Sequence, residues 1–256
     1  MQYKITSKWL LIVFLCIFSN ACVVTSYGSR DKLTEEEKAD LYLQMGVRYM
    51  ELNMLKTSKQ RLEKALDIDS DNADVHNALG ALHERLGQFE IAGDYYEYAL
   101  KKSRDNASIK NNYGQFLCER KGDYTGGMVL LNEALALPLN NKKWIALTNK
   151  GRCQLKSAKK KLAEPNFRRA LRLNRNYLPA LLEMQKISYQ TRKYMSAQAF
   201  LQRYIALAEH NPETLWYAVQ TERALGNKEL TEQYREMLFS LFPESKEAKQ
   251  LRTAIR

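Results

Sequence analysis

The side chains that most often carry chemistry are few in this chain of 256 residues, which has three histidines and four cysteines. His76 and His83 stand at positions where aromatic residues would pack, and His210 is remote from both in the sequence. The sequence contains no phosphate-binding G-x-x-x-x-G-K-[ST] loop, no nucleophile elbow G-x-S-x-G and no zinc-binding H-E-x-x-H. We therefore expect structural histidines and a protein that is not an enzyme, with no catalytic residue, metal, cofactor or small-molecule substrate.

Two of the cysteines lie near the N-terminus, in a segment with the layout of an export signal. Residues 1–21 carry two lysines and no acid, then an apolar run from Trp9 to Phe18, then small residues. This run of ten residues is too short for a membrane-spanning helix, which needs about 20. The letters SNAC, ending at Cys22, resemble the bacterial lipobox, which implies that Cys22 is acylated and begins a lipidated tether over residues 22–38. Ordinary signal cleavage is the alternative.

The rest of the chain is a repeat array, and it must position the other two cysteines. Gly46, Gly80 and Gly114 are 34 residues apart, and Gly151 follows 37 residues later. Ala-Leu pairs recur in step, beginning at Ala65, Ala99, Ala134 and Ala170. A period of this length with this pattern is the tetratricopeptide signature. It predicts an all-α fold, a right-handed superhelical solenoid. The six helix-turn-helix repeats of residues 39–245 are 39–72, 73–106, 107–143, 144–177, 178–211 and 212–245, and residues 246–256 form a C-terminal capping segment.

Each repeat should contain a first helix, called helix A, and a second, called helix B. In repeats one to four we expect the glycine of helix A to face a small residue of helix B, such as Ala92 opposite Gly80, so that the two helices approach closely. Large side chains should fill the space between repeats; they are Tyr96, Tyr113 and Phe167. The turns between helices A and B are expected at Gly87, Gly122 and Gly226. The third repeat holds three extra residues.

Cys118 and Cys153 fall in the A helices of repeats three and four, which run side by side. Helix axes pack about 8–10 Å apart, so facing side chains can reach the Cα separation of about 4.4–6.8 Å that a disulfide needs. An even pair of cysteines in an exported protein favours a disulfide. Two buried free thiols that act as small apolar residues are the alternative. A metal site is not expected, because two cysteines are too few ligands.

A solenoid of this kind offers a concave groove lined by its A helices, which suits an extended peptide or an amphipathic helix. The first repeat contributes an apolar stretch, and later repeats contribute amides and basic residues. Asparagines there can hydrogen-bond a peptide backbone. The candidate groove residues are Leu43, Val47, Met50, Asn77, Arg85, Asn111, Gln115, Arg152, Lys156, Trp216, Gln220 and Arg223.

The chain is basic, with a formal net charge of +11 and a sequence pI of about 9.4. Such a charge suits nucleic acid, anionic lipid or an acidic protein. The basic residues are spread along the chain, and the dense run "KSAKKK" (156–161) accompanies no nucleic-acid-binding motif. We interpret this run as a solvated turn and expect no nucleic-acid partner.

Two stretches, "NNYGQFLCERKGDYTGG" and "ALALPLNNKKWIALTNKGRCQL", resemble the type IV pilus biogenesis lipoproteins of the PilF/PilW family. The resemblance runs from the export signal through repeat six. It implies an outer-membrane protein that faces the periplasm and is anchored by its N-terminal lipid. We expect the free protein to be a monomer. The resemblance also implies a disulfide between Cys118 and Cys153, and a role as a pilotin that brings the pilus secretin to its place or helps it assemble. Two other classes remain open: a scaffold subunit of another envelope assembly or secretion complex, and an adaptor for an envelope enzyme or for peptidoglycan regulation.

Overall fold

The computed structural model describes residues 33–253, and all regular secondary structure in this range is helical. The predictions for residues 1–21 and for Cys22 lie outside it. Residues 33–253 form thirteen α-helices and one π-helix. They are α2 (Glu35–Glu51), α3 (Leu55–Ile68), α4 (Ala73–Arg85), α5 (Phe89–Lys102), α6 (Ala107–Phe116), the π-helix η1 (Leu117–Lys121), α7 (Tyr124–Ala136), α8 (Lys143–Lys156), α9 (Lys160–Leu173), α10 (Leu178–Gln190), α11 (Tyr194–Ile205), α12 (Pro212–Leu225), α13 (Lys228–Leu241) and α14 (Lys246–Thr253). None of the helices in this range combines the length and apolarity needed to cross a bilayer.

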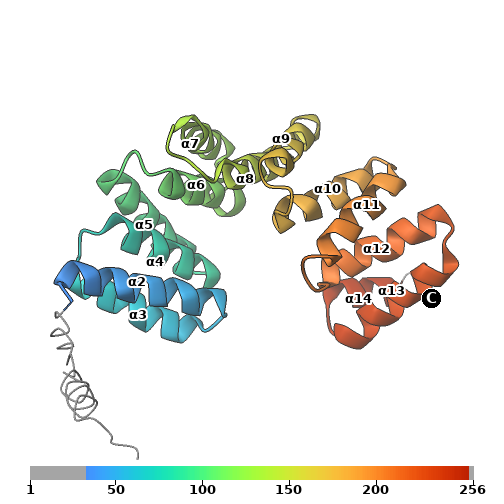
Figure 1. Ribbon diagram of the computed structural model, residues 1–256, viewed down its shortest axis with the longest axis horizontal. Coiled ribbons are helices and arrows are strands. Elements are labelled where there is room, and N and C mark those ends of the chain that lie inside the picture. The colour runs from blue at the N-terminus through green and yellow to red at the C-terminus, as the bar shows by residue number, and fades with distance from the viewer. Residues whose placement is uncertain (1–32, 254–256) are drawn as a thin grey trace, which may run out of the picture.

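Consecutive helices pack as pairs, and the pairs follow one another around an arch (Figure 1). The even-numbered helices from α2 to α12 are the A helices, and each of α2, α4, α6 and α10 also contacts the next A helix. Around the middle of the arch, α6 and α8 lie on its inner side, whereas α7 and α9 lie on its outer side (Figure 1). The all-α solenoid predicted from the 34-residue period is confirmed.

Short-range signals set the helix ends. Thr34 forms a capping box with Glu37 at the start of α2, and the side chains of Asn72 and Asn106 accept hydrogen bonds from the first turns of α4 and α6. The three glycines expected at the turns adopt the left-handed conformation, with φ between 71° and 77°. This prediction is confirmed. The corresponding turns of the other three repeats place non-glycine residues in the same region, at Asn53, Ala158 and Arg192.

The expectation that the recurring glycines face small residues is wrong for three of the four. A Cβ built on Gly80 would lie 2.8 Å from the ring of Tyr96, and one on Gly151 would lie 2.6 Å from the ring of Phe167. Gly46 likewise faces the side chain of Leu62. The glycine therefore makes room for a large side chain of helix B in its own repeat. The rings of Tyr96 and Phe167 thus pack within their own repeats, against the glycine, and not only between repeats as we expected.

In the third repeat the glycine faces both a large side chain and a small residue, since a Cβ built on Gly114 would lie 3.0 Å from the Leu131 side chain. There the backbone oxygen of Gly127 is 3.0 Å from a Cβ built on Gly114. Both residues lack a side chain, so helices α6 and α7 can cross closely at this point.

The π-helix accounts for one of the three extra residues in the third repeat. Gly80 and Gly87 are seven residues apart, but Gly114 and Gly122 are eight apart. The added residue widens the last turn of helix A, where the backbone N–H of Gly122 donates to the carbonyl of Leu117, five residues earlier. The other two extra residues lie in the connection between α7 and α8, which is two residues longer than that between α5 and α6.

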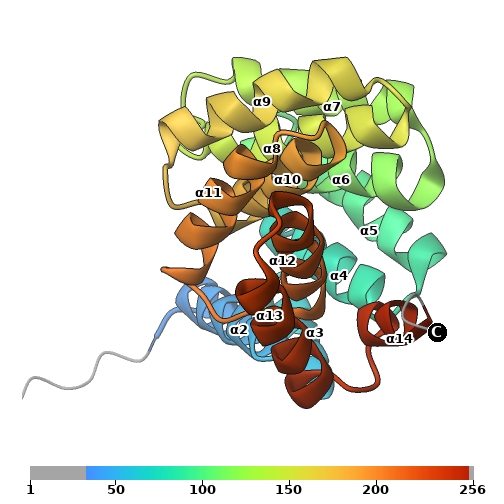
Figure 2. The same ribbon diagram turned by 90° about the vertical axis from the view of Figure 1, so that its right-hand side faces the viewer.

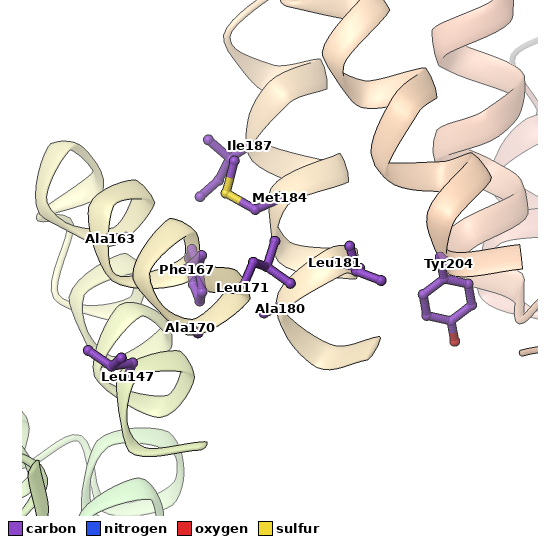
Figure 3. Packing of buried hydrophobic residues seen from close by; sticks show 10 residues of the cluster. All are labelled: Leu147, Ala163, Phe167, Ala170, Leu171, Ala180, Leu181, Met184, Ile187 and Tyr204. Carbon is purple, nitrogen blue, oxygen red and sulfur yellow. The ribbon is translucent and has the colours of Figure 1, made fainter. Parts of the chain in front are cut away.

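Buried apolar clusters hold adjacent repeats together. In the cluster between repeats four and five, Phe167 and Leu171 of α9 meet Ala180 and Met184 of α10 (Figure 3). The last repeat is covered by α14, whose Leu251 is fully buried in a cluster with residues of α12 and α13. This helix lies within the residues 246–256 that we assigned to a capping segment. Because each cluster joins neighbours in the chain, the array is stabilised by coupling between adjacent repeats.

Candidate protein-binding groove

The first three repeats form a pocket on the A helices. Its volume is about 370 Å³. Four predicted groove residues line it, namely Val47, Met50, Arg85 and Gln115. The other lining residues are Glu51, Ala81, Glu84, Tyr96, Asn112 and Arg120. The predicted Leu43 lies on the same helix as Val47, and both side chains are partly buried against the core of repeats one and two. The pocket is therefore apolar on the side of Val47 and Met50 and polar on the side of Glu84 and Arg120.

Hydrogen bonds hold three charged side chains of this pocket in place, those of Glu84, Arg85 and Arg120. The Arg120 guanidinium donates to Glu84 at 2.8 Å, and the Tyr96 hydroxyl donates to the same carboxylate at 3.3 Å. Burial, reinforced by the Glu84 charge, raises the pKa of the Tyr96 hydroxyl far above its usual range. The hydrogen bond to Glu84 also raises the pKa of Arg120. Arg85 donates to the backbone oxygen of Met50 and to Asn53 Oδ1, so it ties α4 to the end of α2.

A ladder of side-chain amides continues the inner surface through repeats two to four. Asn112 donates to Asn77 at 3.1 Å, and Asn111 donates to Asn112 at 3.2 Å. Asn149 then donates to Asn111 at 3.1 Å and to Gln115 at 3.0 Å. The predicted residues Asn77 and Asn111 are buried in this amide ladder. Part of the hydrogen-bonding capacity that we expected for a peptide is therefore used between repeats.

An ionic ladder follows in repeats four to six. Arg152 Nε donates to Glu183 at 2.9 Å, and Lys186 bridges Glu183 and Glu213 at 3.6 and 2.8 Å. Burial alone would lower the pKa of Lys186, but the two carboxylates raise it. The amide ladder and the ionic ladder together pair polar side chains of the inner surface from repeat two to repeat six. Sequence reasoning missed Asn112, Asn149 and Glu183, although all three occupy the sixth position of their repeat windows and are polar.

The remaining predicted residues do not join the first pocket. Trp216 packs edge-on against Tyr217, with ring centroids 4.8 Å apart, and against Tyr189 at 6.2 Å. Gln220 is half-buried on the same helix, and Lys156 is exposed at the end of α8. Arg223 lines a separate pocket between α12 and α13. The predicted groove residues thus lie along the inner surface in several places and do not form one site.

Cys118 and Cys153 are joined by a disulfide, with their α-carbons 5.3 Å apart. Cys118 belongs to the π-helix and Cys153 to α8, and both are buried. A Cβ on Gly127 would collide with the Cys118 sulfur. The other repeats carry a side chain at this position of helix B, namely Ser58, Ala92, Ala163, Ala197 and Thr231. Among the described residues, no three histidines, cysteines or carboxylates are grouped so as to hold a metal ion.

Protein-family models identify the type of repeat in this chain. Two family models match parts of the chain, "TPR repeat" at residues 46–87 and "Tetratricopeptide repeat" at residues 146–177. Together with the paired helices, these matches show a solenoid of tetratricopeptide-like repeats.

Similar full-length proteins give a more specific assignment than the repeat models. The chain is 28% identical over 246 residues to the type IV pilus assembly protein PilF of Pseudomonas aeruginosa, a match that covers 94% of this chain and 96% of PilF. The structure of P. aeruginosa PilF is similar, with a TM-score of 0.71, 29% identity, and coverage of 86% of this chain and 99% of PilF. PilW, described as a widely conserved type IV pilus biogenesis factor, matches with a TM-score of 0.71 and 26% identity over 83% of this chain and 97% of PilW. The chain is therefore homologous to PilF and similar in structure to both PilF and PilW.

Proposed function

We propose that this protein acts in type IV pilus biogenesis as a pilotin, binding the pilus secretin through its inner surface and promoting the localisation or assembly of the secretin. The observation that carries the proposal is the match with PilF, which extends over nearly the full length of both chains. The paired inner surface and the pocket of the first repeats support binding of another polypeptide.

The pocket of the first three repeats is the proposed contact site. Val47 and Met50 offer apolar area, while the pair of Glu84 and Arg120 offers fixed polar groups at the other side. A partner segment with an apolar side chain next to polar groups would fit this arrangement, because pre-organised polar groups do not have to be ordered on binding. The partner is a protein, and no nucleic acid or small molecule enters the proposal.

We further propose that the protein is held at the outer membrane, facing the periplasm, by acyl chains on Cys22. This part rests on the SNAC sequence and on the apolar run before it. Multiple acyl chains give stable anchoring, because each buried methylene contributes about 0.8 kcal/mol. Radioactive palmitate should label the unmodified chain but not Cys22→Ser. A variant that still fractionates with the outer membrane as well as the parent protein would contradict the anchor.

The contact site is tested by crosslinking in cells followed by purification of the tagged protein. Val47→Glu, which places a charge in the pocket, should abolish recovery of the secretin and reduce its multimers. Leu41→Glu is the matched control, because Leu41 is an exposed apolar residue on the same helix but does not line the pocket. Normal secretin recovery with Val47→Glu would exclude this pocket. Normal secretin multimers in a strain that lacks the protein would exclude the pilotin role itself.

A further inference from the structure

Helix α9 differs from the other outer helices in its charge. It carries five basic residues and a single acid, Glu164. The basic residues are Lys160, Lys161, Arg168, Arg169 and Arg172. Lys159 precedes the helix and Arg175 follows it. By contrast, α5 carries three acids and two lysines. The positive charge of α9 is therefore concentrated in this helix and does not simply reflect the excess of basic residues in the whole chain.

Most of this charge is exposed and uncompensated. All five basic residues of α9 are exposed. Glu164 contacts Arg168 at 2.7 Å and Lys193 at 3.8 Å. Within the described part of the chain, the other four basic residues of α9 form no ion pair. In both views α9 lies at the outer edge of the arch (Figures 1 and 2), so a flat surface can approach it.

An arginine-lined pocket opens between α9 and α11. Its volume is about 420 Å³. The lining residues are Arg168, Leu171, Arg172, Arg175, Phe200 and Arg203. Arg203 donates to the backbone oxygen of Arg175 at 2.7 Å and lies 5.6 Å from the centre of the Phe200 ring. Guanidinium groups present a planar fork of donors, which matches the oxygens of a phosphate.

Apolar side chains accompany the charge. Leu162 and Leu173 are exposed by 55% and 53%. Their spacing of eleven residues places them within about 20° of each other around the helix axis. Basic residues beside exposed leucines are typical of a helix that lies on a membrane, with its apolar groups at the boundary between headgroups and acyl chains.

We propose that the outer face of α9, with the arginine-lined pocket beside it, binds the phosphate headgroups of an anionic phospholipid surface. The positive charges extend over the whole helix, a length of about 20 Å. They include lysines as well as arginines and are interspersed with leucines on a convex ridge. An acidic segment of another protein is less favoured, because it would pair with the arginines of the pocket and leave the exposed Leu162 and Leu173 without an apolar partner. The contact would hold the solenoid against the membrane with its inner surface turned away, and it does not depend on the secretin proposal.

The test is co-sedimentation with vesicles of the chain that remains after removal of the export signal, residues 22–256. All forms carry Cys22→Ser, so that neither the apolar run of the signal nor acyl chains contribute to binding. Vesicles of phosphatidylcholine with about one-third phosphatidylglycerol are compared with phosphatidylcholine alone, at low and at physiological salt. We expect binding to the anionic vesicles only, weakened by salt. Each basic residue near an anionic surface contributes about fivefold to affinity, so Lys161→Glu/Arg169→Glu/Arg172→Glu should weaken binding at least a hundredfold.

The matched control is Lys56→Glu/Lys101→Glu/Lys228→Glu. It makes the same change in net charge at three exposed lysines on other helices. This control should retain most of the binding, and circular dichroism should show both variants folded. Equal losses in the two variants would mean that only the total charge matters, which overturns the proposal. Binding of poly-glutamate through α9 without binding of anionic vesicles would also overturn it, in favour of an acidic protein partner.

Discussion

At Gly80 the helix has no side chain because the ring of Tyr96 occupies the space where a Cβ would stand. The cost of glycine in a helix, about 1 kcal/mol relative to alanine, is offset by the packing of a large side chain against the backbone. Gly93 has the opposite surroundings. A Cβ there would lie 3.6 Å from Phe116, an ordinary van der Waals contact.

These two glycines give a matched pair of substitutions. Gly80→Ala should lower the free energy of unfolding by about 1–3 kcal/mol, because the methyl group forces the Tyr96 ring to move. Gly93→Ala should raise it by up to about 1 kcal/mol, because the helix gains propensity and loses no contact. Urea-induced unfolding followed by circular dichroism measures both. A neutral or stabilising Gly80→Ala would show that the ring moves without cost.

At the scale of single elements, the turn between the helices of a repeat requires one residue with positive φ. Glycine supplies it in three repeats, but Ala158 and Arg192 adopt φ of 61° and 60°. A residue with a Cβ pays about 1–2 kcal/mol for this conformation, and part of this is recovered because it is less flexible than glycine in the unfolded chain.

We therefore expect Ala158→Gly and Arg192→Gly each to raise the thermal midpoint, with a gain of about 0.5–1 kcal/mol. The reciprocal change, Gly226→Ala, should cost about 1 kcal/mol. A Cβ on Gly226 would meet no atom within 4 Å, so this loss would report backbone conformation alone. Differential scanning calorimetry distinguishes the cases. A fall in midpoint with both glycine variants would contradict the argument.

The disulfide links the π-helix of repeat three to α8 of repeat four. Its closed loop spans a sequence separation of 35 residues, which corresponds to roughly 3–4 kcal/mol in the chain-entropy model. Cys118→Ala/Cys153→Ala should therefore unfold at a clearly lower urea concentration than the oxidised parent protein. Adding a reductant should lower the midpoint of the parent and leave that of the variant unchanged. Titration of two free thiols in the purified parent protein would exclude the bond.

At the scale of the whole molecule, buried phenols make stability depend on alkaline pH. Burial raises the pKa values of five tyrosines, which are Tyr96, Tyr113, Tyr177, Tyr189 and Tyr234. Above about pH 10 the unfolded chain loses phenolic protons that the folded chain keeps. The unfolded state is then favoured, so this contribution to stability is complete below that pH and is lost as the pH rises.

Tyr96→Phe removes one of the five tyrosine hydroxyl groups whose pKa values are raised. The free energy of unfolding of the parent should fall steeply above pH 10, and the variant should fall less steeply by about 1.4 kcal/mol per pH unit. The variant will start from a lower stability at neutral pH because it lacks the hydrogen bond to Glu84. Urea unfolding between pH 8 and pH 11 gives both slopes. Parallel slopes would mean that Tyr96 titrates alike in both states.

The sequence predicted the helix pairs and three of the turns, because a 34-residue period and glycines with positive φ leave local patterns. It did not predict what covers each glycine. Ala92 and Tyr96 are four residues apart on α5, and only the packed geometry shows that the Tyr96 ring faces Gly80. The two polar ladders were also missed. Asn112 and Asn149 reach across repeats, and a scan of single positions does not reveal contacts between residues that far apart in sequence.

The π-helix has a consequence for anyone who wishes to move the disulfide to another repeat pair. Residues of an α-helix are turned by about 100° from one to the next. Deleting the one extra residue would therefore swing the Cys118 side chain away from Cys153. Gly127 must accompany it, because any Cβ there would displace the sulfur. The extra residue of the π-helix, the glycine at position 127 and the two cysteines must therefore be transferred together. Copying the two cysteines alone into a regular repeat would leave them as free thiols.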